Sequence, residues 1–227
     1  NKSDSFSVDW FKPKVSRARR ATLGKFIIMA IASAVSIPVS HVIIRNHLTS
    51  TISLDAAGIW TGMWNISTAY LMVVTTTLSV YYLPKLSGLK DATSIKKEIR
   101  HGQAIILPIV IVSSLVIYFT KGTIILLLFD NKFLLMSQLF AFQLLGDFVK
   151  IATFLYGYSM VAKARVKAFV FVELFFSVLF VFLTMLFVDM YGLLGVSIAF
   201  AVNYGICFIF VFWWFHRSCT RGIFNES

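Results

Sequence analysis

Six apolar stretches, each long enough to cross a lipid bilayer, constrain this chain more than any other feature. A spanning helix needs about 20 mostly apolar residues. Stretches of that kind cover residues 23–44, 56–83, 103–119, 133–162, 168–188 and 193–215. Charged residues make up only 14% of the chain, against roughly 25% in soluble domains, so little polar surface remains to cover a core in water. We therefore predict an all-α fold, a polytopic membrane bundle of six transmembrane helices.

One further apolar run, residues 123–129, is too short to span. We expect it to form an interfacial or re-entrant turn of helix between the third and fourth spans. Pro38 and Pro108 lie inside spans, where neighbouring helices can satisfy the freed backbone groups. Both prolines predict kinks.

The basic residues alternate along the chain. Sixteen of the 21 Lys and Arg lie before residue 23, in the second-to-third and fourth-to-fifth connections, or after residue 215. The other three connections hold only Arg45, Lys121 and Lys132. Short loops rich in Lys and Arg stay cytoplasmic. We therefore predict a cytoplasmic basic segment at 1–22, a six-helix lobe at 23–215 and a cytoplasmic tail at 216–227.

Several function classes find no support in the residues. The net charge of +11 is spread over segments that flank apolar runs, which fits an anionic membrane surface better than a nucleic-acid partner. Cys207 and Cys219, with only His216 nearby, match neither a zinc pattern nor a disulfide framework. No nucleophile elbow, zinc-protease or phosphate-loop motif is present. We expect no catalytic residues, no metal and no cofactor, and hence no enzyme.

Three ionisable residues inside spans are the most informative. Asp147 and Lys150 lie in the fourth span and Glu173 in the fifth. A charge at the centre of a membrane helix costs about 2.5–3.5 kcal/mol, and such residues face a bundle interior or water. Gln143 shares one helix face with Asp147 and Lys150. The Asp147–Lys150 pair could be structural or line a cavity, and Glu173 could snorkel to the surface or line the same cavity.

Two further features leave alternatives open. Arg45 ends the first span, where it could snorkel or attract an anionic substrate. The second span carries a polar stripe that could bond neighbouring helices or line a water-filled cavity: Asn65, Thr68, Thr75, Thr76 and Ser79. The candidates for a substrate or ion path are Arg45, Asn65, Thr68, Gln143, Asp147, Lys150 and Glu173.

The fourth span also carries a resemblance. Its run of residues 144–150 (LLGDFVK), followed by Gly157-Tyr158 and Ala162-Lys163-Ala164, resembles the C-terminal half of Wzx-type O-antigen and lipid III flippases. These form a polysaccharide transporter branch of the multidrug/oligosaccharidyl-lipid/polysaccharide exporters. Gly58-Ile59-Trp60 and Asn131-Lys132-Phe133 support the resemblance.

The resemblance implies a twelve-helix transporter with two six-helix lobes around a central cavity, of which this chain is the second lobe. Such flippases move undecaprenyl-diphosphate-linked oligosaccharide repeat units across the bacterial inner membrane for lipopolysaccharide biosynthesis, driven by an ion or proton gradient as in an antiporter. Asp147, Lys150 and Arg45 match the family's charged cavity positions, whereas Thr68 stands where some relatives carry an acid. Either Asp147 or Glu173 could bind a coupling proton.

The implied partners are the lipid-linked oligosaccharide, the bilayer, an N-terminal lobe, a polysaccharide polymerase and a chain-length regulator. Because the sequence starts at Asn1 rather than Met, we expect a fragment that lacks this N-terminal lobe. Alternatives are export of another lipid-linked or amphipathic substrate, a membrane oligosaccharide polymerase and a structural membrane subunit. The short outer connections argue against the polymerase, and a structural subunit would leave the intramembrane charges unexplained.

Overall fold

The fold is a bundle of long helices in a computed structural model that describes residues 17–222. Within that range the chain is all-α and contains no β-strand, which confirms the predicted fold class of a polytopic membrane bundle. The helices are α1 (Arg17–Thr51), α2 (Leu54–Thr77), the π-helix η2 (Leu78–Tyr82), α3 (Leu83–Gly88), α4 (Ala92–Leu128), the 3₁₀-helix η3 (Asn131–Gln138), α5 (Phe140–Ala162), α6 (Val166–Tyr191) and α7 (Leu194–Thr220).

Five or six spans are present in the described chain, depending on how one bent segment is counted. Five helical segments are each long and apolar enough to cross a membrane, and η3 with α5 passes the same test only as a pair bent by 58°. The fourth predicted span, 133–162, falls on this pair. The predicted count of six is reached when the bent pair is one span.

Residues 123–128 are helical, but they continue α4 through Leu128 and do not form a turn of their own, so the predicted end of the third span at residue 119 is wrong. The apolar residues extend the helix past Gly122, and the helix ends where the Phe129 N–H bonds the Ile125 carbonyl at 2.8 Å. At 37 residues and 1.5 Å per residue, α4 is about 55 Å long, which exceeds the hydrocarbon thickness. Its charged first turns and its outer end therefore extend beyond the apolar layer.

The predicted outer segments also overlap helices. Of the basic segment 1–22, residues 1–16 lie outside the described part of the chain, and α1 starts at Arg17. Of the tail 216–227, residues 216–220 continue α7 and 223–227 lie outside the description. The second span joins α2, η2 and part of α3.

Short polar residues define several helix ends. The Ser53 side chain accepts a hydrogen bond from the Ala56 N–H at 3.1 Å and caps α2, and Asp91 caps α4 through the Ser94 N–H at 2.9 Å. These caps satisfy backbone donors that the first turn leaves unpaired. Gly192 adopts a φ of 58°, which lets α6 reverse into α7 within two residues. Tight reversals of this kind keep consecutive helices antiparallel and adjacent.

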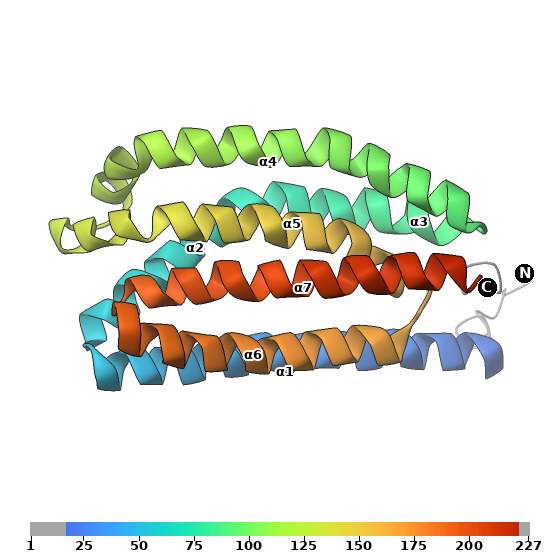
Figure 1. Cartoon of the computed structure of the whole chain (residues 1–227), viewed down its shortest axis with the longest axis horizontal. Coiled ribbons are helices and arrows are strands. Elements are labelled where there is room, and N and C mark those ends of the chain that lie inside the picture. Colours follow the sequence, from blue (N-terminus) through green and yellow to red (C-terminus); the bar gives the residue numbers. More distant parts are fainter. Residues whose placement is uncertain (1–16, 223–227) are drawn as a thin grey trace, which may run out of the picture.

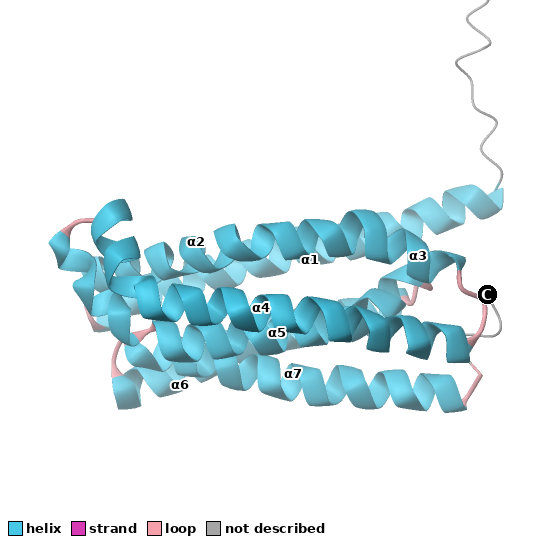
Figure 2. Cartoon of the chain, turned by 90° about the horizontal axis from the view of Figure 1, so that it is seen from above, coloured by secondary structure: helices cyan, strands magenta, loops and turns pink. Residues whose placement is uncertain are grey.

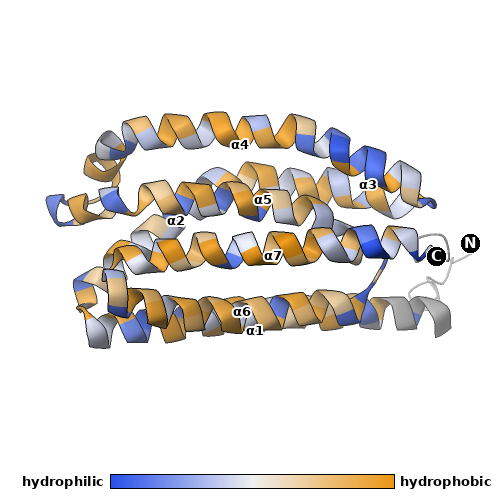
Figure 3. Ribbon diagram, viewed as in Figure 1, coloured by the Kyte–Doolittle hydropathy of each residue, from blue (hydrophilic) through white to orange (hydrophobic). Residues whose placement is uncertain are grey.

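The helices run roughly parallel to one long axis, with α4 on one side of the bundle and the α1–α6 pair on the other (Figures 1 and 2). The α3–α4 connection, the α5–α6 connection and the end of α7 meet at one end (Figure 1). Hydrophilic residues gather there, while the middle of the bundle is mostly apolar (Figure 3). The α3–α4 connection, the α5–α6 connection and the end of α7, all of them basic, thus share one end of the described bundle.

The central helix is α5, which packs most closely on α7. Gly146 makes this approach possible, because a Cβ there would overlap the Phe200 ring and come within 3.2 Å of the Ala201 Cα. The outer surface of α4 is apolar instead, with Phe119 and Leu127 each 80% exposed. An apolar exterior of this extent is stable in lipid rather than in water. The fold therefore surrounds the charged segment of α5 with other helices.

Candidate functional site: a charged cavity inside the bundle

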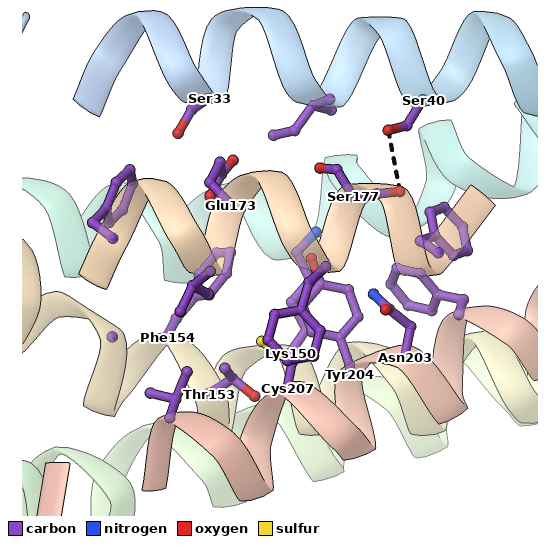
Figure 4. A pocket seen from close by; sticks show the side chains of 18 of the residues that line it. Ser33, Ser40, Lys150, Thr153, Phe154, Glu173, Ser177, Asn203, Tyr204 and Cys207 are labelled. Atoms are coloured by element: carbon purple, nitrogen blue, oxygen red, sulfur yellow. Dashed lines mark hydrogen bonds between the residues drawn. The ribbon is translucent and has the colours of Figure 1, made fainter. Parts of the chain in front are cut away.

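A cavity of about 460 Å³ lies between the α1–α6 pair and helices α2, α5 and α7. Lys150, Glu173, His41, Trp64, Asn203 and Tyr204 are among the residues that line it. Figure 4 shows polar side chains entering it from α1, α5, α6 and α7. The remaining wall is mostly aliphatic and aromatic. Charged groups thus line an otherwise apolar cavity within the membrane-spanning part of the bundle.

The Lys150 ammonium lies among four aromatic rings. Its Nζ is 5.2 Å from the ring centroid of Trp64, 5.8 Å from those of Phe154 and Tyr204, and 6.0 Å from that of Phe200. Each of these distances is within the range of a cation–π interaction, which contributes about 0.5–2 kcal/mol depending on solvation. No ion pair within 4.0 Å joins Lys150 to another described residue. The rings therefore stabilise the ammonium without neutralising it.

Asp147, three residues earlier on α5, faces α2 instead of the cavity. It is 0% exposed, and the Ser67 Oγ lies 2.6 Å from both of its carboxylate oxygens. The Tyr70 hydroxyl donates a further bond at 2.9 Å. Gln143, also buried, donates from Nε2 to the Ser67 Oγ at 3.4 Å. A carboxylate held by several donors is stabilised inside a low-dielectric interior.

Glu173 enters the cavity from α6 and points toward Ser33 of α1 (Figure 4). It is half-buried and makes no ion pair within 4.0 Å with any described residue. One turn along α6, the Ser177 carbonyl accepts a bond from the Ser40 hydroxyl at 3.4 Å, which ties α1 to α6. Lys150 interacts electrostatically with both Glu173 and Asp147. The site thus combines two carboxylates with one ammonium.

The other predicted site residues lie elsewhere. Arg45, Asn65 and Thr68 are exposed and do not line the cavity. Thr75 is the one member of the predicted polar stripe that lines it. Ser79 contacts the Tyr158 hydroxyl at 2.8 Å, so that end of the stripe bonds α5. Asn65 and Thr68 form instead an exposed polar face on α2.

Sequence reasoning missed several site residues. Ser67 and Tyr70 hold Asp147, yet they belong to a different face of α2 from the predicted stripe. His41, Trp64 and Asn203 line the cavity, and the His41 ring packs edge-on against Trp64 at a centroid distance of 4.2 Å. The spacing of Ser67 and Tyr70, three residues apart on one helix face, was an available signal.

A metal centre is not indicated by the described residues. Residues 17–222 contain no group of three or more His, Cys, Asp and Glu side chains that could hold a metal ion. The Asp147 cluster offers one carboxylate, two hydroxyls and an amide. Its two hydroxyls donate to that carboxylate, and the Gln143 amide donates to the Ser67 hydroxyl.

The fold and site define a class: a multi-pass helical membrane protein with an internal charged cavity. Comparison with known proteins identifies relatives within this class. The chain is 34% identical to the lipid III flippase of Escherichia coli strain K12 over 212 residues, which are 91% of its length. It matches the lipid III flippase of Shigella flexneri to the same extent. The resemblance to flippases of the Wzx type is thereby confirmed. The chain spans about half, 51%, of the length of these curated relatives.

No protein-family model matches the chain, and no solved structure matches it.

Proposed function

We propose that this chain forms part of a flippase that moves lipid-linked oligosaccharides across the bacterial inner membrane. The observation that carries the proposal is a cavity lined by Lys150 and Glu173 inside a membrane bundle that is similar, over 91% of the chain, to lipid III flippases. Charges inside a membrane bundle are costly and mark substrate or ion paths. The reaction moves a substrate and breaks no covalent bond, so the protein is a transporter rather than an enzyme.

The substrate we propose is an undecaprenyl-diphosphate-linked repeat unit of O-antigen or of enterobacterial common antigen. Its glycan and diphosphate need a polar path, while the prenyl tail can stay in lipid. The exposed polar face of α2 at Asn65 and Thr68 is expensive against lipid and suits a hydrated space or a second bundle. We therefore propose that this face and Arg45 border a path shared with a second six-helix lobe.

Ion coupling follows from the local charges. With Asp147, Lys150 and Glu173 all ionised, the site carries one net negative charge in a low-dielectric region, which is unfavourable. A proton or a monovalent cation would neutralise it. Asp147 already accepts bonds from Ser67 and Tyr70, so Glu173 is the better candidate to exchange a proton or cation with the cavity. Transport driven by an ion gradient would use this exchange.

The orientation we propose puts the basic end of the bundle in the cytoplasm. The α3–α4 and α5–α6 connections and the end of α7 share that end (Figure 1), and short basic loops favour the cytoplasmic side. The opposite connections would face the periplasm.

The experiment is complementation of a flippase-deficient strain, scored by surface polysaccharide and by membrane levels of the protein. Lys150→Met and Glu173→Gln should each reduce surface polysaccharide strongly at unchanged protein level. Arg20→Gln, a charge removal at an exposed position of α1, is the matched control and should leave it unchanged. Full polysaccharide with both cavity variants would refute the site, and no complementation by the parent protein would refute the substrate class.

A further inference from the structure

The cavity contains polar groups whose bonding capacity is unused within the described chain. Lys150 and Glu173 are not in ion-pair contact with any described residue, although the Ser33 side chain is a hydrogen-bond partner of Glu173. The Asn203 Oδ1, on a side chain only 5% exposed in the cavity wall, has no hydrogen-bond partner among the described residues. Buried polar atoms are nearly always bonded. One donor group and two acceptor groups therefore face the same space, where a ligand can bond the Asn203 oxygen and make further bonds to Lys150 and Glu173.

The charges exclude the simplest ligands. A prenyl or acyl chain would leave the Lys150 ammonium without a hydrogen-bond acceptor and the Asn203 amide oxygen without a donor, which is costly in a low-dielectric site. A phosphate would be attracted by Lys150 but repelled by Glu173. An organic cation would be attracted by Glu173 but repelled by Lys150. Lys150 and Glu173 line the cavity with opposite charges, so a ligand that both donates and accepts hydrogen bonds can bond both groups. Hydroxyl groups do both.

The walls add a second requirement. The Trp64 and Tyr204 rings flank the Lys150 ammonium at 5.2 and 5.8 Å, and the His41 ring, which also lines the cavity, packs against Trp64 at a centroid distance of 4.2 Å. Flat rings beside hydrogen-bonding groups suit a ligand with an apolar C–H face and a polar rim. The volume of about 460 Å³ is within the roughly 300–1,000 Å³ typical of small-molecule sites. A sugar ring combines a C–H face with hydroxyls at its rim.

We propose that the cavity binds sugar rings of the lipid-linked glycan, and not its diphosphate or prenyl chain. This inference rests on the proposed flippase function and names the part of the substrate that this site takes. Lys150 donates to sugar oxygens, Glu173 and Asn203 accept from sugar hydroxyls, and Trp64 supplies the stacking surface.

Cys207 offers a direct footprint of the cavity. Its side chain lines the same wall (Figure 4), whereas Cys219, also buried, does not line the cavity. The full-length protein is reconstituted into vesicles that contain undecaprenyl-diphosphate-linked repeat unit, bare undecaprenyl diphosphate or neither lipid. Alkylation of Cys207 by N-ethylmaleimide is then followed by peptide mass spectrometry, with Cys219 as the internal reference.

We expect the glycosylated lipid alone to slow the alkylation of Cys207, with Cys219 unaffected. Asn203→Leu should weaken this protection, with a roughly two- to tenfold higher half-protecting concentration for one lost hydrogen bond. The variant should fold well, because the Asn203 Oδ1 bonds nothing in the described protein. Ser197→Ala is the matched control on α7: it also removes a buried oxygen without a partner, but lies outside the cavity, and should leave protection unchanged.

Equal protection by bare undecaprenyl diphosphate would overturn the sugar assignment, and so would protection by neither lipid. Translocation is measured in the same vesicles, which separates the two proposals. Translocation without protection refutes the sugar site and leaves the flippase function intact. Protection without translocation supports the sugar site and refutes the flippase function.

Discussion

The buried carboxylate of Asp147 should owe much of its tolerance to Ser67. The side chain is 0% exposed, and the Ser67 hydroxyl lies 2.6 Å from each of its oxygens, so one proton is shared between them. Hydrogen bonds to charged groups contribute about 1.5–3 kcal/mol. Ser67→Ala removes this donor and also deprives the Gln143 amide of its acceptor at 3.4 Å. The bond from Tyr70 at 2.9 Å remains.

We therefore expect Ser67→Ala to lower the free energy of unfolding by about 1.5–3 kcal/mol. For a chain of 150–250 residues this corresponds to a fall in Tm of roughly 3–12 °C. The measurement is thermal unfolding of the purified protein in lipid nanodiscs, followed by fluorescence. Thr184→Val is the matched control, because the Thr184 side chain is equally buried and its hydroxyl has no partner among the described residues. It should cost little or even stabilise.

A double-mutant cycle decides whether the loss comes from this bond. In an Asp147→Asn background the carboxylate charge is gone. The loss in free energy of unfolding caused by Ser67→Ala should therefore be smaller there than in the parent protein, by at least about 1 kcal/mol. Equal costs in the two backgrounds would mean that the Ser67–Asp147 bond contributes nothing measurable. The reasoning about a donor-stabilised carboxylate would then be refuted.

Two other variants test helix packing and capping. Gly146→Ala should lower the free energy of unfolding by about 1–3 kcal/mol, because the added Cβ overlaps the Phe200 ring. Gly205→Ala is the control: a Cβ at that position has no atom within 4 Å, so the variant should be neutral or stabilising in the same unfolding assay. Equal Tm values for the two variants would contradict the close α5–α7 contact. The Ser94 side chain and backbone N–H hold the pKa of Asp91 below its usual 3.8, so its cap on α4 is present at neutral pH and lost as the pH falls below that value. Asp91→Ala should therefore reduce hydrogen-exchange protection of the Ser94 amide at pH 7, and the effect should shrink as the pH is lowered below 3.8. An effect that does not change with pH would contradict a charge-dependent cap.

Helical periodicity predicted that Gln143, Asp147 and Lys150 share one face. It did not predict that these side chains contact different surroundings. Asp147 turns toward α2 and Lys150 toward the cavity, since three residues on a helix are 60° short of a full turn. On α2 the polar stripe was read from Asn65 and Thr68, yet Ser67 and Tyr70 bond Asp147. In a membrane helix apolar residues face both lipid and neighbours, so composition gives little contrast between the two sides.

The prediction for residues 123–129 missed the continuation of α4 for a related reason. The length of the run suggested a short element, but no residue in the run stops a helix. Gly122 is tolerated within α4 because no packing contact needs a side chain there: a Cβ added at this position would have no atom within 4 Å. The break comes later, at η3, whose 58° bend against α5 has no Gly or Pro to mark it. Tertiary contacts of Met136 and Leu139, both fully buried, fix the bend instead. Local sequence does not record such contacts.

The side chains of the charged pair on α5, Asp147 and Lys150, therefore differ in how easily they can move. Asp147 accepts hydrogen bonds from Ser67 and Tyr70 of α2, so moving it would break several bonds at once. Lys150 is held by rings whose attraction is broad in angle and distance, so its ammonium can shift within the cavity at low cost. A ligand or an ion at Glu173 would act on Lys150 first. The rigid Asp147 carboxylate is therefore a fixed counter-charge for Lys150.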